Sequence, residues 1–232
     1  MQKTFRGVYT VMITPLDASG AVDLKGLATF TDWQVKEGIH GLIPLGSTGE
    51  FLSLSEEERD GVARTVIETV AGRVPVLIGT GAEDTRESIR LSVKAEAMGA
   101  DGVMIIPPFY STPTDDELVH HYKSIASAVA IPIMVYNNPA TANVDLTPEL
   151  VKRIAEIDGC DYIKESTLEV TRVRDIIRLA GDVYQIDYLP MKLTSSDFLM
   201  IVSATLVLSF FATIIPARRA GALLPVDVLR YE

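Results

Sequence analysis

Reactive side chains follow several short apolar runs of the sequence, and the most unusual of them is a lysine. Lys164 lies in the run DYIKES, whose other features favour a buried strand. Burying an ammonium group is costly unless it is paired, and burial favours the neutral amine. A neutral amine is a nucleophile that attacks ketones to form a Schiff base. Lys164 is therefore a candidate nucleophile, and a salt-bridged or surface lysine is the alternative interpretation.

Hydroxyl groups lie at the ends of three other apolar runs. Tyr136 ends one run and Tyr110 follows another, and a phenol beside a reactive lysine could move protons. A Gly-Ser-Thr-Gly turn offers the hydroxyls of Ser47 and Thr48, with backbone N–H groups through Gly49, and such groups can bind a carboxylate. The alternatives are two core tyrosines and an ordinary loop.

Six apolar, β-branched runs must position these side chains. Each is too short for a helix and is apolar at nearly every position, which is typical of a buried parallel strand. In parallel architectures the functional groups gather at the carboxyl ends of the strands. The pattern fits either a doubly wound sheet or a (β/α)₈ barrel. The expected strands are residues 8–14, 41–46, 74–81, 102–108, 131–137 and 161–166.

Helix-start signals lie between the strands. Ser55 with Glu58 forms a capping box that predicts a helix through about Val70. A second helix is expected from Asp84 to Met98, before Gly99. Thr147, followed by proline and glutamate, predicts the start of a third.

The composition excludes several classes of protein. The chain has 232 residues and a net charge of −10, which argues against a nucleic-acid binder. A single cysteine, Cys160, excludes a disulfide framework, and three histidines leave little for a metal site. We expect Cys160 and Trp33 in the core, and His120 and His121 on a helix surface. The amino terminus has no apolar signal region, which predicts a cytoplasmic start.

Four longer segments carry a resemblance to a known family. They are GSTGEFLSLSEEER (46–59), PPFYSTP (107–113), VYNNPATANVDLTPELV (135–151) and YIKEST (162–167). Together they resemble the dihydrodipicolinate synthase / N-acetylneuraminate lyase family of class I aldolases, over residues of about 5–182. The resemblance implies an α/β fold, an incomplete (β/α)₈ TIM barrel with about six βα units. It also implies a homo-oligomer that acts on pyruvate or a related 2-keto acid, with no cofactor and no metal.

The same resemblance implies roles for individual residues. Lys164 would be the Schiff-base lysine, and Tyr136 the general acid/base beside it. Ser47, Thr48 and Gly49 would hold the keto-acid carboxylate, and Ser47 would help to relay protons. Tyr110 matches a tyrosine that family members lend across a subunit interface.

One position departs from the family pattern. Family members that act as dihydrodipicolinate synthases resemble YNxPxRT at the fifth strand, where the arginine binds the carboxylate of the aldehyde substrate. Thr141 stands in the arginine place here. Threonine cannot form a bidentate clamp on a carboxylate. A sugar-acid aldolase or dehydratase acting on a 2-keto-3-deoxy acid is therefore at least as plausible.

The last fifty residues have a different character. Residues 198–217 contain no charged side chain and could span a bilayer as one helix, which would place the chain at the inner membrane. The segments IDYLPMKL, PARRA and PVDVLRYE resemble the end of lipoprotein-releasing ABC permeases of the LolC/LolE type. The expected domains are thus a truncated aldolase barrel over 1–182 and a permease-like tail over 183–232.

The two parts require opposite placements. Three arginines follow the apolar span: Arg218, Arg219 and Arg230. The positive-inside rule therefore places the carboxyl terminus in the cytoplasm and residues 1–182 on the opposite side of the membrane. Those residues resemble a cytoplasmic enzyme. The interpretation favoured here is a Schiff-base lyase, and the alternatives are an inactive chimera joined near residues 182 and 183 or a membrane permease fragment.

Overall fold

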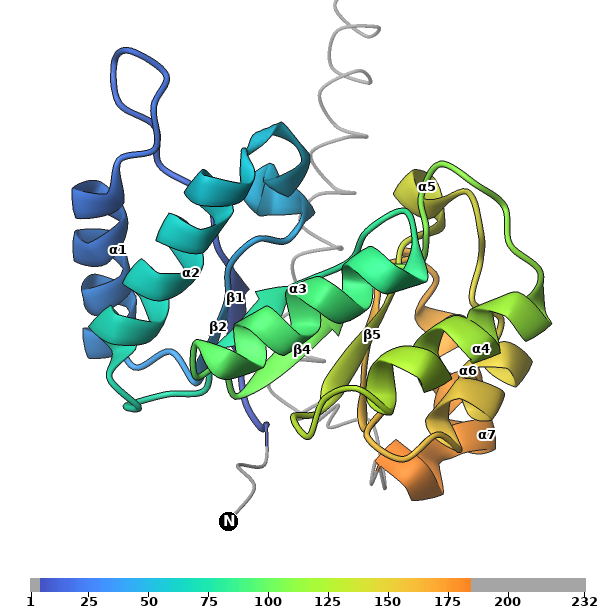
Figure 1. Ribbon diagram of the computed structural model, residues 1–232. Helices are drawn as coiled ribbons and strands as arrows, with labels where there is room; N and C mark the ends of the chain where they lie inside the picture. The colour runs from blue at the N-terminus through green and yellow to red at the C-terminus, as the bar shows by residue number, and fades with distance from the viewer. Residues whose placement is uncertain (1–4, 185–232) are drawn as a thin grey trace, which may run out of the picture. The chain divides into compact units, whose positions relative to one another are not determined.

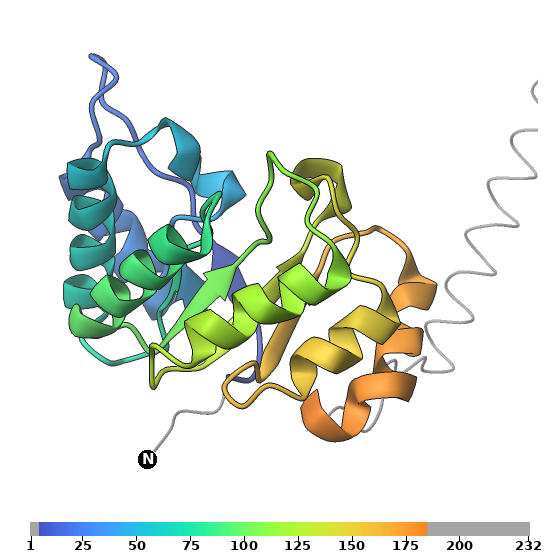
Figure 2. The same cartoon turned by 45° about the vertical axis from the view of Figure 1, so that its right-hand side comes forward.

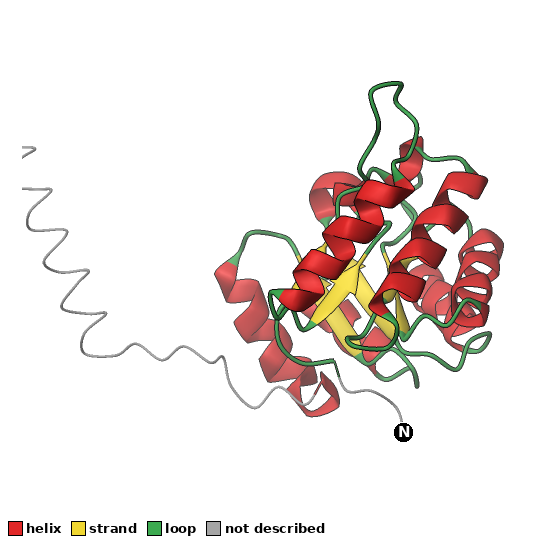
Figure 3. Cartoon of the chain, turned by 90° about the vertical axis from the view of Figure 1, so that its left-hand side faces the viewer, coloured by secondary structure: helices red, strands yellow, loops and turns green. Residues whose placement is uncertain are grey.

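The computed structural model describes residues 5–184, which form an α/β layer of parallel strands covered by helices (Figures 1 and 3). All six expected strands are present, each shorter than its apolar run. A parallel bridge between Leu42 and Val76 joins the second strand to the third. The strands are β1 (Tyr9–Val11), β2 (Gly41–Ile43), β3 (Leu77–Gly79), β4 (Gly102–Ile105), β5 (Ile133–Asn137) and β6 (Tyr162–Glu165).

The strand order distinguishes the two expected architectures. Each strand lies beside the next one in the chain, and every pairing is parallel. A doubly wound sheet reverses its order at a switch point, whereas the strands of a (β/α)₈ barrel follow chain order. The described residues therefore form six consecutive strands of a barrel-type sheet.

The helices begin where the capping signals place them. Ser55 and Glu58 form the reciprocal capping box of α2, Asp84 accepts from the backbone at the start of α3, and Thr147 caps α6. These contacts confirm all three expected starts. The longer helices are α1 (Leu24–Lys36), α2 (Glu56–Val70), α3 (Thr85–Ala97), α4 (Asp115–Ala126), α6 (Pro148–Ala155) and α7 (Val170–Tyr184). The four-residue helix α5 (Pro139–Ala142) follows β5, and Figure 2 shows α4, α6 and α7 beside one another.

Two apolar cores lie on opposite faces of the strands. Val103 and Ile105 of β4 pack under the helices, whereas Met104 between them joins a second cluster on the other face. Side chains alternate between faces along a strand, so this division marks an outer and an inner layer. In the inner layer the rings of Phe5, before β1, and Tyr162, in β6, have centroids 4.8 Å apart. The sheet is therefore curved enough to bring the segment before β1 beside β6.

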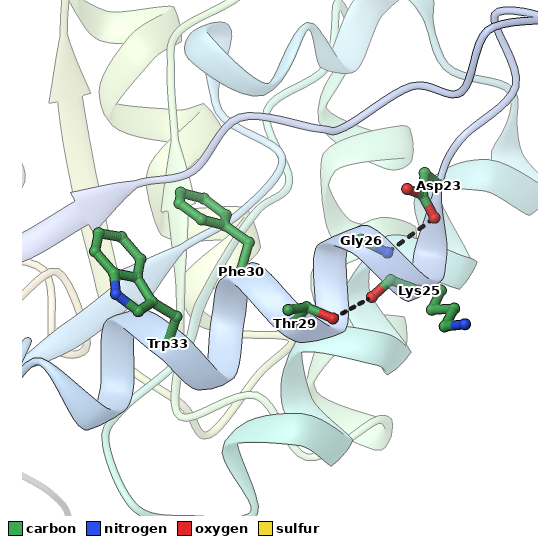
Figure 4. A pocket seen from close by; sticks show the side chains of 6 residues that line it. All are labelled: Asp23, Lys25, Gly26, Thr29, Phe30 and Trp33. Carbon is green, nitrogen blue, oxygen red and sulfur yellow. Dashed lines mark hydrogen bonds between the residues drawn. The ribbon is translucent and has the colours of Figure 1, made fainter.

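Three single-residue expectations can be compared with the structure. Cys160 is fully buried, as expected, and burial raises the pKa of its thiol to about 12. Trp33 was expected in the core, but it is 54% exposed and stacks on Phe30, one turn away on α1 (Figure 4). His121 was expected on a surface and is only 3% exposed, because its position on α4 faces Thr85, whose hydroxyl lies 2.9 Å from Nδ1.

The burial of His121 predicts a pH-dependent stability. Burial lowers its pKa to about 4, with a smaller opposing effect from Asp84 and a further lowering from His120. As the pH falls from about 6.5 towards 4, the His121 imidazole is therefore protonated in the unfolded chain but stays neutral in the folded chain. Between pH 7 and pH 5 we expect the wild type to lose about 2 kcal/mol of unfolding free energy through this group. Urea titrations at both pH values measure the loss.

Two variants isolate this effect. His121→Gln removes the titration, so its unfolding free energy should fall by about 2 kcal/mol less than that of the wild type over the same pH interval. His120→Gln changes the exposed neighbour, whose effect on His121 is smaller than that of burial, and should keep most of the wild-type slope. Equal slopes for the wild type and His121→Gln would contradict the prediction.

The expected tail lies outside the described residues. Contacts divide the chain into two units, Met1–Tyr188 and Leu189–Glu232. Helix α7 continues through Tyr184, past the expected junction at residues 182 and 183. The span at 198–217 and the permease-like segments are not described and stay predictions. Among the helices of residues 5–184, none combines the length and the apolar character that a membrane span requires.

Candidate active site

The register between β5 and β6 places the two principal candidates side by side. Tyr136 pairs with Lys164 across the parallel strands, so both side chains lie on the inner face. The Lys164 amine lies 3.3 Å from the centroid of the Tyr136 ring. The sequence predicts Lys164 in a buried strand, but all four residues of β6 are only partly buried, because among the described residues β6 pairs with β5 alone. A neutral Lys164 stays a prediction.

The environment of Tyr136 favours proton transfer. The side chain is almost completely buried, and burial alone would raise the pKa of the phenol. Lys164, Asn138 and Ser166 together outweigh burial and hold the pKa of Tyr136 below its usual range. The phenol can therefore lose its proton more readily than a tyrosine in water, which suits a group that exchanges protons with a lysine.

The Gly-Ser-Thr-Gly turn forms a short 3₁₀ helix after β2, at the same carboxyl edge of the sheet. The sequence predicts that the Gly49 N–H binds substrate. In the structure this N–H donates to the Gly46 carbonyl at 3.0 Å, as a 3₁₀ turn requires. The backbone N–H groups of Ser47 and Thr48 have no acceptor among the described residues. These two donors and the two exposed hydroxyls are the groups that the turn offers to an anion.

The backbone on both sides of this turn is strained. Leu45 has a φ of 60° and Glu50 a φ of 54°, values in the left-handed region that residues with a side chain rarely adopt. Gly79 of β3 allows the close approach of this segment, because a Cβ there would lie 2.0 Å from the Leu45 carbonyl oxygen. Such strain is retained where surrounding structure enforces it, and it often accompanies a functional site.

A cavity of about 240 Å³ connects the turn with two other strand ends. Ser47 shares its lining with Ile106, after β4, and with Thr141 of α5. The only charged side chain among the described residues of the lining is the carboxylate of Glu50. The other lining residues are Phe51, Leu52, Ser53 and Phe109. The cavity is thus mainly apolar with hydroxyl groups at its edge.

Tyr110 lies apart from the other candidates. Its side chain is 88% exposed, and its backbone N–H donates to the Glu83 carboxylate at 3.0 Å. Asn143 holds the same loop through the Phe109 carbonyl at 2.7 Å. The structure therefore brings Lys164 and Tyr136 into contact and places Ser47 and Thr48 at the same edge, while Tyr110 points away from the chain's own described residues.

Two asparagines act on the pair and were given no role by sequence analysis. The Nδ2 of Asn138 donates to the Tyr136 hydroxyl at 2.8 Å. Asn137 is fully buried and donates to Glu165 at 2.9 Å and to Asp145 at 3.1 Å. The only signal in the sequence is the polar Asn-Asn pair directly after Tyr136, which does not say where either amide points.

The part of the chain that the structure describes can be compared with the ligand sets of metal sites. Within residues 5–184, no three His, Cys, Asp or Glu side chains are placed to share a metal ion. The chemistry of the site is that of an amine beside a phenol and a set of hydroxyl and N–H donors. An amine of this kind can form a covalent Schiff base with a ketone without an added group.

The chain is similar to proteins of one family. The model of the dihydrodipicolinate synthetase family matches residues 4–187. A 4-hydroxy-tetrahydrodipicolinate synthase of Nitrobacter hamburgensis is 40% identical over 186 residues, which are 77% of this chain and 62% of that protein. The corresponding synthase of Syntrophus aciditrophicus is 37% identical over 220 residues, 93% of this chain and 73% of that protein. That alignment extends past residue 187 and gives no support to a permease-like tail.

Solved structures of the family have the same fold. The chloride-inhibited dihydrodipicolinate synthase of Acinetobacter baumannii in complex with pyruvate has a TM-score of 0.76 at 36% identity, covering 78% of this chain and 62% of that one. YagE, a family member from Escherichia coli K12 in complex with pyruvate, has a TM-score of 0.75 at 38% identity, covering 79% and 62%. This chain thus spans less than two thirds of the length of several relatives. Its strand order, its Lys164–Tyr136 pair and these matches show that the chain belongs to the dihydrodipicolinate synthetase family.

Proposed function

We propose that this protein is a Schiff-base-forming lyase or synthase that acts on pyruvate or a related 2-keto acid. The observation that carries the proposal is the Lys164 amine 3.3 Å from the Tyr136 ring centroid, at the carboxyl edge of a parallel sheet. The amine attacks the keto carbon, a water molecule leaves, and the imine remains on Lys164. Tyr136 supplies and removes the protons of these steps.

The turn after β2 binds the carboxylate of the keto acid in this proposal. The turn offers neutral hydrogen-bond donors, which are the backbone N–H groups and the hydroxyls of Ser47 and Thr48. Several such donors together can hold an anion. A carboxylate held there would fix the orientation of the neighbouring ketone towards Lys164. Tyr110 completes the proton relay of a second copy of the chain, which is consistent with its 88% exposure.

The lining of the cavity beside Ser47 favours a second substrate that is not strongly acidic at its far end. Thr141 occupies the place of a carboxylate-binding arginine, and Glu50 would repel an anion. A hydroxylated aldehyde, as released from a 2-keto-3-deoxy sugar acid, fits hydroxyl groups and an apolar wall better. We therefore infer cleavage or dehydration of such an acid rather than condensation with an acidic aldehyde.

Borohydride trapping tests the proposal on the full chain. Pyruvate followed by borohydride should add the mass of one pyruvate, less one water and plus two hydrogens, because reduction makes the imine permanent. Peptide mass spectrometry should place this addition on Lys164 and leave the exposed Lys152 unmodified. Folded protein without an adduct from pyruvate or from any 2-keto-3-deoxy acid would refute the proposal. The relative yields of the acids identify the preferred substrate.

A further inference from the structure

The side-chain amide of Asn138 forms a hydrogen bond with Tyr136 instead of capping helix α5. An asparagine at the N-cap, just before the first helical residue, usually accepts a hydrogen bond from a backbone N–H of the first turn with its side-chain oxygen. Asn138 is the N-cap of α5, and its backbone carbonyl accepts from Thr141 and Ala142, each at 3.0 Å, but its side chain makes no capping bond. Its Nδ2 instead donates to the Tyr136 hydroxyl oxygen at 2.8 Å.

This contact has a direction that matters for proton transfer. An amide N–H can donate but cannot accept, so it stabilises a phenolate more than a neutral phenol. The Asn138 N–H uses one lone pair of the phenol oxygen. The second lone pair and the phenol proton stay available for proton transfer. The other groups that act on the phenol are Lys164, whose amine lies over the ring 3.3 Å from its centroid, and the Ser166 hydroxyl.

We propose that Asn138 is a positioning residue that holds the Tyr136 oxygen beside Lys164 and favours its ionised form. The phenolate can then take a proton from the Lys164 ammonium, which leaves a neutral phenol and a neutral, nucleophilic amine. The catalytic consequence rests on the proposed function, but the effect of Asn138 on Tyr136 belongs to the free protein and needs no substrate.

A purely structural role for Asn138 is the competing explanation. In that case the residue would serve only to start α5, and its loss would loosen the segment without a specific effect on Tyr136. Asn143 provides a matched control at the other end of α5, because its amide donates to the Phe109 carbonyl and not to Tyr136. Its φ of 48° suits glycine, so Asn143→Gly removes the amide without backbone strain.

The experiment is a pH titration of the full chain with ¹³Cζ-labelled tyrosine, followed by NMR. The Tyr136 signal is assigned by its loss in Tyr136→Phe. Asn138→Val, which keeps a similar volume without a donor, should raise the pKa of Tyr136 by about one unit, as expected for the loss of one hydrogen bond to an ionised group. Asn143→Gly should leave the wild-type value.

A second variant covers the case in which Asn138→Val does not fold. Asn138→Asp is nearly isosteric but replaces the donor by an anion, so it should raise the pKa of Tyr136 further than the loss of the donor alone. Wild-type titration in Asn138→Asp or in folded Asn138→Val would overturn the inference, as would an equal shift in Asn143→Gly. Failure to trap pyruvate or any 2-keto-3-deoxy acid would refute the proposed function and leave this titration result unaffected.

Discussion

Replacing Lys164 by alanine is expected to slow deuterium exchange at the methyl group of pyruvate by about 10³-fold or more, since covalent catalysis depends on its nucleophile. The imine on Lys164 withdraws electrons from the adjacent carbon, so a methyl proton can leave to a base and give an enamine. In D₂O the reverse step returns a deuteron. Proton NMR of pyruvate measures the exchange and requires no second substrate.

A surface lysine is the control for this experiment. Lys152 of α6 is exposed and is not a residue of the candidate site, so Lys152→Ala should keep the wild-type exchange rate. Lys164→Ala should also keep the fold, because Lys164 is only partly buried and β6 retains its pairing with β5. Wild-type exchange in folded Lys164→Ala would mean that another group activates pyruvate, and the role assigned to Lys164 would be wrong.

The strands and helix starts could be predicted from the sequence because their signals are local. A buried parallel strand is an apolar run whatever its neighbours are, and a capping box such as Ser55 with Glu58 satisfies backbone groups within one turn. The proximity of Tyr136 and Lys164 follows from the same logic. Each lies at the carboxyl end of a strand, and consecutive strands in a barrel-type sheet are neighbours.

Burial on the helices could not be predicted in the same way. Trp33 is a typical core residue by type, but its exposure depends on what covers the open side of α1, which the residue itself does not encode. His121 and His120 are adjacent and chemically identical, and only the packing of α4 against α3 decides that His121 contacts Thr85. The direction of the Asn138 amide is likewise a property of the folded turn after β5.

Replacing the buried Asn137 by leucine is expected to lower the free energy of unfolding by about 3 kcal/mol, because the buried Leu146 N–H and the partly buried Glu165 carboxylate lose their partner at once. The amide oxygen accepts from the Leu146 N–H at 3.0 Å, and Nδ2 donates to Asp145 and Glu165. Leucine has the same branched outline, although it is larger, and cannot replace any of these bonds. Urea unfolding at pH 7 measures the loss.

The same substitution should also affect the chemistry, because Asn137 and Glu165 pair across β5 and β6 directly beside the pair Tyr136 and Lys164. The hydrogen bond from Asn137 to Glu165 lies on the face of the sheet opposite to Tyr136 and Lys164. It helps to fix the register that brings the amine and the phenol together. The borohydride adduct at Lys164 should therefore decrease in folded Asn137→Leu. The exposed Asn143 is the control, since Asn143→Gly loses an amide without leaving buried groups unpaired and should lower the unfolding free energy by less than about 1 kcal/mol. Equal losses in the two variants would show that the Asn137 network does not fix β5 against β6.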